Sequence, residues 1–196
     1  MRTLRPALVL IVLFTLLTGV VLPIAFSGVA TAVAPQLAGG SIVERDGKPV
    51  GSALIGQNFA SGRYFHGRPS ATTDTDPNDP SKTVPVPYDA NSSGGSNLAP
   101  TSKALIDRVT KDVAAIGLKS VPGDMVTTSA SGLDPDISPE NAMLQVARVA
   151  RARNLPEDRV RGLVEQHVEG RLFGLLGQPR VNVLSLNLAL DALKVS

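Results

Sequence analysis

The stretch TSASGLDPDISPENA, residues 128–142, has the composition of a loop in its first part and of a helix start in its last part. Its first part is small, polar and rich in aspartate and proline, which is typical of a stiff surface loop. Ser138, Pro139 and Glu140 then form a strong helix start. Serine caps free N–H groups, proline suits the first helical turn, and a carboxylate is favoured at the positive end of the helix dipole. We therefore predict a rigid loop followed by a helix.

Apolar residues at helical spacing continue from this start. The stripe after Ser138 predicts one amphipathic helix that ends before Pro156, and a second helix is predicted from about Pro156 to Val168. A third lies near the C-terminus, and an earlier helix is predicted between Ser102 and Gly117. The apolar positions of the three later helices are Ala142, Val146, Val149 and Ala150; Val160, Val164 and Val168; and Val183, Leu186, Leu190 and Leu193.

The region before residue 128 mixes short apolar pieces with one long polar segment. GSALIGQNF (51–59) and RYFHG (63–67) suit strands or irregular packed segments, and residues 124–128 are predicted as a short strand. Residues 69–100 show neither a period of 2 nor a period of 3.6, so we predict a long surface loop. Its length suggests an insertion that is functional or is ordered by a partner.

The N-terminal segment is apolar and long enough to cross a membrane. No charged residue occurs from Pro6 to Val43, and a helix of ~20 residues crosses a ~30 Å hydrocarbon core. One interpretation is a permanent anchor. The other is a cleaved secretory signal, because residues 30–32 and 32–34 both have the A-x-A form of a cleavage site.

Both interpretations place the remainder of the chain outside the cytoplasm, because Arg2 and Arg5 precede the apolar run and positive charge stays inside. We expect residues 1–35 to form a cytoplasmic N-terminus and a transmembrane anchor. Residues 36–196 are expected to form a single extracytoplasmic domain. The predicted fold class is α+β, with a helical C-terminal half.

The composition excludes several functional classes. The chain has 19 Lys and Arg against 17 Asp and Glu, and two of the basic residues precede the apolar run, so the remainder has no net charge. Without Trp it also lacks stacking platforms for single strands, and we expect no nucleic-acid partner. The absence of Cys excludes disulfides, thiolate zinc sites and a cysteine nucleophile.

No recognised catalytic or metal motif is complete. DTDPND (74–79) imitates the start of a calcium loop but lacks the required glycine and the closing glutamate. His66 and His167 occur singly in different regions, and neither Ser129 nor Ser131 sits in a G-x-S-x-G elbow. We therefore predict no catalytic residue, no metal site and no tightly bound cofactor.

Two stretches remain as candidate sites. SSGGSN (92–97) could present backbone amides to an anion or form a flexible turn, and the acidic residues Asp134 and Asp136 precede a helix whose far end is basic. That charge order is either simple complementarity to the helix dipole or a surface for a partner or a cation. The nucleotide-associated candidates are Ser93, Gly94, Gly95, Ser96 and Asn97.

Several blocks together closely resemble the C subunit of the Kdp potassium-transporting ATPase, the KdpC family. They lie at residues 51–71, 92–102, 121–155 and 180–193, in the order that the family has them. They read GSALIGQNF, RYFHGRPSA, SSGGSNLAPTS, VPGDMVTTSASGLDPDISPENAMLQVARVARARNL and RVNVLSLNLALDAL.

The resemblance implies a non-catalytic accessory subunit with one N-terminal helix in the cell inner membrane. Such a subunit assembles with a channel-like potassium-binding subunit, a P-type ATPase subunit and a small single-helix subunit, and the complex uses ATP to import potassium. The family is described as a catalytic chaperone that raises the ATPase subunit's affinity for ATP. Its Ser-Gly-Gly-Ser stretch is likened to the signature loop of ABC ATPases, with Asn97 here in the place of glutamine. ATP and potassium are thus expected to act at the level of the complex.

The predicted topology opposes direct contact with ATP, because the nucleotide is cytoplasmic and the domain is expected outside. We therefore expect the nucleotide effect to be indirect, through stabilisation of one conformation of the pump. Two alternatives are a gate or potassium-capturing module that uses Asp134 and Asp136, and a subunit that binds nucleotide directly through Ser93–Asn97.

Overall fold

The computed structural model describes residues 3–118 and 120–193. The chain divides into two compact units, Met1–Ser52 and Ala53–Ser196, which are considered separately below. The predicted boundary after residue 35 falls inside the first unit, just after its long helix.

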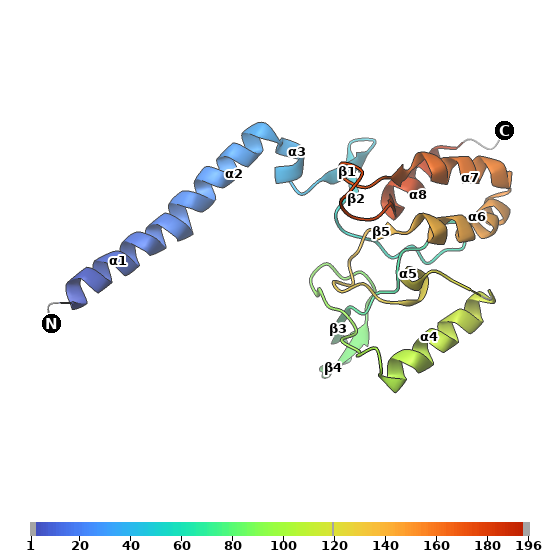
Figure 1. The fold of residues 1–196 in the computed structure, drawn as a ribbon, viewed down its shortest axis with the longest axis horizontal. Coiled ribbons are helices and arrows are strands. Elements are labelled where there is room, and N and C mark those ends of the chain that lie inside the picture. Colours follow the sequence, from blue (N-terminus) through green and yellow to red (C-terminus); the bar gives the residue numbers. More distant parts are fainter. Residues whose placement is uncertain (1–2, 119, 194–196) are drawn as a thin grey trace. The chain divides into compact units, whose positions relative to one another are not determined.

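The first unit begins with one long apolar helix, drawn in blue in Figure 1. It consists of α1 (Leu4–Leu16), a π-helical turn η1 (Leu17–Val21) and α2 (Leu22–Val33). None of its side chains is buried within the protein, and its 30 residues make it a candidate membrane span. At 1.5 Å per residue the helix is ~45 Å long, so it can cross a ~30 Å hydrocarbon core.

The π turn has a local cause. Proline cannot donate the N–H that would bond four residues back, and its ring crowds that carbonyl. Pro23 stands in the first turn of α2, directly after η1, and the wider turn makes room at Gly19, the residue four before it. The helix therefore continues through the proline.

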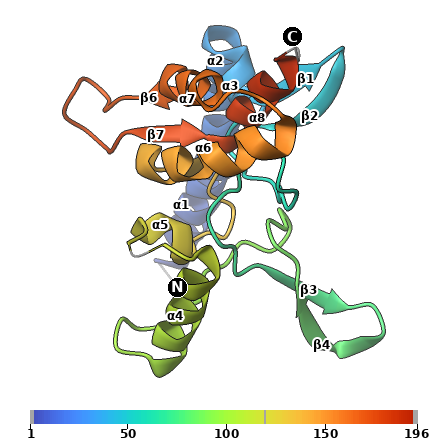
Figure 2. The same ribbon diagram turned by 90° about the vertical axis from the view of Figure 1, so that its right-hand side faces the viewer.

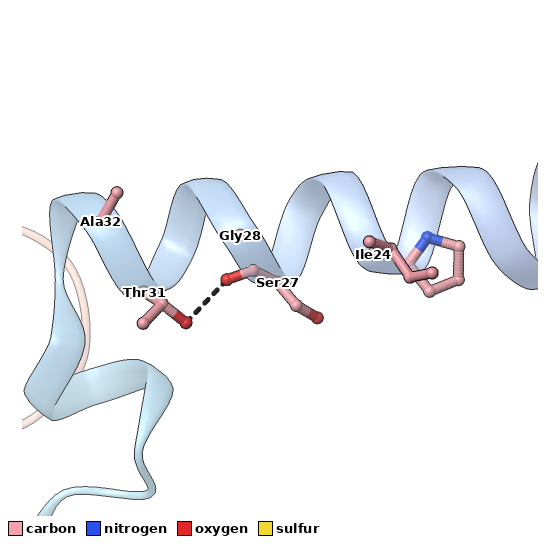
Figure 3. A pocket seen from close by; sticks show the side chains of 6 residues that line it. Ile24, Ser27, Gly28, Thr31 and Ala32 are labelled. Atoms are coloured by element: carbon pink, nitrogen blue, oxygen red, sulfur yellow. Dashed lines mark hydrogen bonds between the residues drawn. The ribbon is translucent and has the colours of Figure 1, made fainter.

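The polar side chains of this helix bond to the helix itself. The Thr31 hydroxyl donates to the Ser27 carbonyl at 2.8 Å, as Figure 3 shows, and the Thr18 hydroxyl donates to the Phe14 carbonyl at 2.6 Å. Small residues around Gly28 leave a shallow, open depression on this face. Internal bonding of the hydroxyls is what a lipid environment requires.

A short helix α3 (Pro35–Ala38) and a hairpin complete the first unit. The hairpin pairs β1 (Ile42–Arg45) with β2 (Lys48–Ser52). Asp46 and Gly47 both have positive φ at the turn, as a two-residue hairpin loop requires. Ser52 donates to the Gly40 carbonyl at 2.7 Å, which joins the hairpin to the end of α3.

The second unit mixes helices and strands, so the α+β fold class with a helical C-terminal half is confirmed. The elements of this unit are β3 (Thr73–Asp76), β4 (Asp79–Pro85), α4 (Lys103–Ile116), α5 (Gly123–Val126), β5 (Asp136–Ile137), α6 (Pro139–Arg153), α7 (Glu157–Gln166), β6 (Val168–Glu169), β7 (Arg180–Asn182) and α8 (Val183–Ala192).

The core lies between α6, α7, α8 and a small sheet. The sheet has the order β5-β7-β6, and both pairs are antiparallel. Figure 2 shows these helices gathered around β7. The apolar stripes predicted for the three helices are buried, except that Leu193 is partly buried and Val168 lies exposed in β6.

The predicted start of α6 is confirmed and has an additional support. The Ser138 hydroxyl accepts from the Asn141 N–H at 3.1 Å. Asp124 in α5 accepts from the Ser138 N–H at 2.7 Å and from the Asn141 side chain at 3.0 Å. The strand predicted at residues 124–128 is therefore wrong, because Asp124 is held in a one-turn helix that caps α6.

Residues 63–67 form the irregular packed segment that the sequence left as one of two options. Phe65 is fully buried, and side chains rather than a neighbouring strand satisfy the backbone around it. The Asn187 amide accepts from the Phe65 N–H and donates to the Phe65 carbonyl, both at 2.9 Å. The Gln145 amide does the same for His66, at 2.8 and 3.0 Å. We call residues 62–67 the clamped segment.

The long loop predicted at residues 69–100 is partly wrong, since it contains the hairpin β3–β4. Most side chains on both strands are exposed, so no alternation of apolar and polar residues marks them in the sequence. The Asp76 carboxylate accepts from the Asn78 N–H at 2.8 Å and fixes the turn. This hairpin also explains the DTDPND stretch, which is its first strand and turn.

Candidate functional site

Four segments that are distant in sequence meet in the second unit, and most of the residues that carry the family resemblance before α6 lie there. They are residues 54–59, 66–72, 86–97 and 128–136, which we call the loop cluster. Backbone bonds join them: the Gly56 N–H donates to the Leu133 carbonyl and the Gly94 N–H to the Ser131 carbonyl, both at 2.8 Å. The 128–142 stretch is thus the hub of the cluster.

Tyr88 stands at the centre of the loop cluster. A Cβ added to Gly56 would overlap its ring, and a Cβ added to Gly67 would overlap its hydroxyl oxygen. Its hydroxyl donates to the Arg68 carbonyl at 2.7 Å. Burial, together with the nearby Asp134 carboxylate, raises the pKa of Tyr88 to about 12. The phenol therefore remains protonated at neutral pH and serves as a structural donor.

Arg68 and Asp134 form an ion pair across the cluster. The Arg68 guanidinium lies 3.0 Å from the Asp134 carboxylate, and both side chains are largely covered. The same guanidinium donates to the Thr128 carbonyl at 3.4 Å. The charge of Asp134 is therefore compensated within the chain and contributes little negative field to the surface.

Asp136 is paired separately. Its carboxylate lies 3.1 Å from the Arg180 guanidinium and accepts from the Asn182 side chain at 3.3 Å. Burial raises the pKa of Asp136 above its ordinary value, and the Arg180 charge opposes that shift. The structure thus gives each of the two candidate acids its own arginine. Among the described residues, no group of three or more His, Asp and Glu could hold a metal ion.

The glycine-rich candidate stretch acts as a brace against residues 130–132. The Gly94 N–H and the Ser93 hydroxyl both donate to the Ser131 carbonyl, at 2.8 and 3.1 Å. Gly95 lies against Ala130 so closely that an added Cβ would stand 2.9 Å from the Ala130 carbonyl oxygen. The Gly94 amide is therefore already hydrogen-bonded within the protein.

A hollow of about 540 Å³ opens on the outside of the loop cluster. Leu54 and Ile55 form one side of it, and the Arg68–Asp134 pair and small residues of the 128–135 loop form the other. Both apolar side chains are exposed. This combination of a small apolar rim and a half-buried ion pair resembles a docking surface more than a reaction centre.

The two histidines and the two candidate serines make hydrogen bonds to other groups and not to one another. His66 is half-buried with its Nε2 at 3.0 Å from the Ser61 carbonyl, and burial lowers its pKa. The His167 Nδ1 lies 2.8 Å from the Leu163 carbonyl. Ser129 is buried, and Ser131 accepts from the Leu133 N–H at 3.1 Å. None of these contacts forms a nucleophile–base pair.

Sequence reasoning missed Arg68 and Tyr88 as organising residues. Arg68 lies in the block RYFHGRPSA, which the resemblance had marked without giving its role. Tyr88 lies between the matching blocks, in a polar segment without periodicity, so no local signal singled it out.

Comparison with known proteins decides the family. The family described as "K+-transporting ATPase, c chain" matches residues 4–192, which includes the apolar helix and the loop cluster. This chain belongs to the KdpC family. The match begins at the residue where α1 begins, so the apolar helix is part of the KdpC pattern.

Curated KdpC relatives match over nearly their whole length. The protein named "Potassium-transporting ATPase KdpC subunit" of Bradyrhizobium diazoefficiens is 60% identical over 97% of both chains. The proteins of that name from Rhodopseudomonas palustris and Methylobacterium nodulans are 60% and 61% identical, over 99% and 98% of this chain and 100% and 98% of theirs. The predicted resemblance is confirmed, and the chain is a KdpC subunit of a potassium-transporting ATPase.

Proposed function

We propose that this KdpC subunit is a membrane-anchored, non-catalytic part of the pump that stabilises the assembled complex and raises the ATP affinity of its ATPase subunit indirectly. The observation that carries the proposal is the internal use of the glycine-rich stretch, whose Gly94 amide bonds to Ser131. A stretch that braces the loop cluster shapes a surface for other subunits. The proposed partners are a channel-like potassium-binding subunit, a P-type ATPase subunit and a small single-helix subunit.

The proposed location follows from charge. Arg2 precedes the apolar helix and Arg5 lies in its first turn, and the next charged residue is Glu44. We propose that the apolar helix spans the inner membrane. By the positive-inside rule its N-terminus is then cytoplasmic and the second unit is extracytoplasmic. ATP then binds on the opposite side, so its affinity changes only because the subunit binds one state of the pump better than another.

Topology is tested with single cysteines, since the chain has none of its own. Asn78→Cys, in the exposed turn of β3–β4, is expected to react in intact cells with a thiol reagent that cannot cross the inner membrane. Thr3→Cys, before the helix, is expected to react only after lysis. Reaction of Thr3→Cys alone in intact cells would reverse the orientation and remove the reason for an indirect effect.

Assembly is tested by affinity purification of the full chain from potassium-starved cells. The other pump subunits are expected to co-purify in detergent. Recovery of the tagged chain alone, or release of a processed form into the medium, would contradict a retained and assembled subunit.

Variants of two neighbouring glycines, Gly94 and Gly95, distinguish a structural role of this stretch from a nucleotide-binding role. Gly95→Ala is expected to destabilise the second unit by about 1–3 kcal/mol, because its Cβ meets the Ala130 carbonyl. Gly94→Ala is expected to have little effect, since nothing lies within 4 Å of its Cβ. The measurements are chemical denaturation of the purified chain and the apparent KM of the complex for ATP.

The direct nucleotide alternative makes a different prediction for this pair. A phosphate cradle would lose affinity when either glycine gained a side chain, and the isolated chain would be labelled by a photoreactive ATP analogue. The brace predicts a change in KM for Gly95→Ala only, with no labelling of the isolated subunit.

Potassium capture remains the other alternative, and the ion pairs argue against a large effect. In the complex, the double variant Asp134→Asn, Asp136→Asn is expected to lower stability, because Arg68 loses its carboxylate partner and Arg180 keeps only Glu169. The potassium concentration for half-saturation is expected to stay within about twofold, because the two charges are already compensated. A large increase at low ionic strength would favour the capture role.

A further inference from the structure

The connection between β6 and β7 projects an apolar tip that the core does not use. The four large side chains of this tip are Leu172, Phe173, Leu175 and Leu176, which are 61, 85, 80 and 62% exposed. Figure 2 shows the connection extending beyond the sheet and the helices of its unit. A soluble domain usually buries such side chains or scatters them singly, so a contiguous group at the end of a projection indicates a contact surface.

The tip is an ordered turn and not a loose loop. The Leu172 N–H donates to the Leu176 carbonyl at 2.9 Å, and the reverse bond is 3.0 Å. Phe173 and Gly174 have φ of 53° and 73°. A left-handed conformation is unfavourable for phenylalanine, yet Phe173 adopts it with its side chain 85% exposed. The local backbone therefore presents the apolar side chains outward.

Charge changes sharply along the projection. No charged residue occurs from Leu172 to Pro179. At the base, Arg171 donates to the Gln178 side chain at 2.9 Å, and Arg180 lies 2.8 Å from Glu169. An apolar end above this collar of charged and amide side chains matches the layering of a bilayer surface, where acyl chains lie beneath polar headgroups.

We infer that the apolar tip inserts into the surface of the membrane that the chain's own helix spans. This inference rests on the proposed anchorage. Residues 34–52 connect the apolar helix to the second unit, and they reach less than ~70 Å even when fully extended. A domain of the size of the second unit has a radius of gyration of only ~15 Å. The chain itself therefore tethers the tip to the membrane, and tethering raises its local concentration there.

A lipid surface fits the small size of the tip better than a protein partner does. The four side chains lie within five consecutive residues, and three of them, Leu172, Phe173 and Leu176, border an open hollow of about 480 Å³. A stable protein interface needs an area of about 800 Å² on each partner. A bilayer accepts a few apolar side chains in any orientation. Insertion would fix the height of the loop cluster above the membrane, where the other subunits lie.

The test uses the full chain in liposomes with a fluorophore on a single introduced cysteine. Leu175→Cys places the label on the tip and keeps Phe173, and Asn78→Cys is the matched control in the other exposed turn. We expect the label at residue 175 to show blue-shifted emission, quenching by spin-labelled lipid, and several-fold weaker quenching by aqueous iodide than the label at residue 78.

The outcomes test the insertion of the tip independently of the membrane anchor. Resistance of the chain to alkaline extraction from the liposomes establishes the anchor independently of the fluorescence. If the chain is retained but the label at residue 175 is as open to iodide as that at residue 78, the inference is overturned. It is equally overturned if that label becomes shielded only after the other pump subunits are added, because the tip would then be a protein contact.

Discussion

Replacing Asn187 with alanine is expected to lower the free energy of unfolding of the second unit by about 4 kcal/mol, because a buried backbone donor and acceptor each cost about 1–3 kcal/mol when left without a partner. Asn187 is 1% exposed, and its amide makes two bonds of 2.9 Å to the N–H and carbonyl of Phe65. Alanine removes both bonds. Water cannot replace them easily, since Phe65 is fully buried.

The control for this prediction is Asn91→Ala, an asparagine whose side chain is exposed in the loop cluster. Its expected effect is below about 0.5 kcal/mol, as for most surface substitutions. Both are measured by urea denaturation of the full chain in detergent, followed by tyrosine fluorescence. Equal effects for the two asparagines would mean that the clamped segment does not depend on Asn187.

Replacing Gly132 with alanine is expected to cost about 2–5 kcal/mol and to remove the chain from the pump, because it combines backbone strain with a steric clash. Gly132 has φ of +69°, and an added Cβ would stand 2.5 Å from a Thr72 methyl group and 2.7 Å from the Gly94 carbonyl oxygen. The three residues come from three segments of the loop cluster. One methyl group therefore separates the segments that form the proposed docking surface.

Gly117 provides a matched control, since it has φ of +74° and nothing within 4 Å of its Cβ. Gly117→Ala is expected to show only the strain of a left-handed alanine, about 1–2 kcal/mol, and to leave co-purification of the pump subunits intact. Thermal unfolding and affinity purification are measured on both variants. Normal co-purification of the Gly132→Ala complex would show that the loop cluster is not required for assembly.

Local signals predicted the helices well. The start of α6 was predicted because Ser138, Pro139 and Glu140 act on their immediate neighbours, and its end at Arg153 precedes the predicted break at Pro156. The buried face of α8 was predicted because its apolar residues recur at helical spacing. Both depend on interactions within one turn or one face, which the sequence displays directly.

Elements that depend on distant partners were not predicted. Residues 124–128 have the composition of a strand, but the Asp124 carboxylate reaches Ser138 and Asn141 and favours a helical turn instead. The hairpin β3–β4 has few buried side chains, so its pattern is that of a loop. In both cases the deciding contact is absent from the local window.

The residues of the candidate site were chosen from the sequence, but their partners within the chain were not predicted. The site roles of Asp134, Asp136 and the Ser93–Asn97 stretch stay predictions. Nothing in the sequence indicated that Arg68, Arg180 and Ser131 had already taken up their charges and hydrogen bonds. Pairings across the chain decide whether a polar group is free to act on a ligand.

The clamped segment has a consequence for biosynthesis. Its backbone relies on amides from α6 and α8, and the amide that holds Phe65 comes from Asn187, close to the end of the chain. During synthesis Phe65 leaves the ribosome long before Asn187 exists. In the proposed topology the domain therefore stays pliable while it is threaded through the export machinery, and locks only when the last helix arrives. A chain truncated before residue 183 is expected to leave the amide hydrogens around Phe65 open to rapid exchange with deuterium.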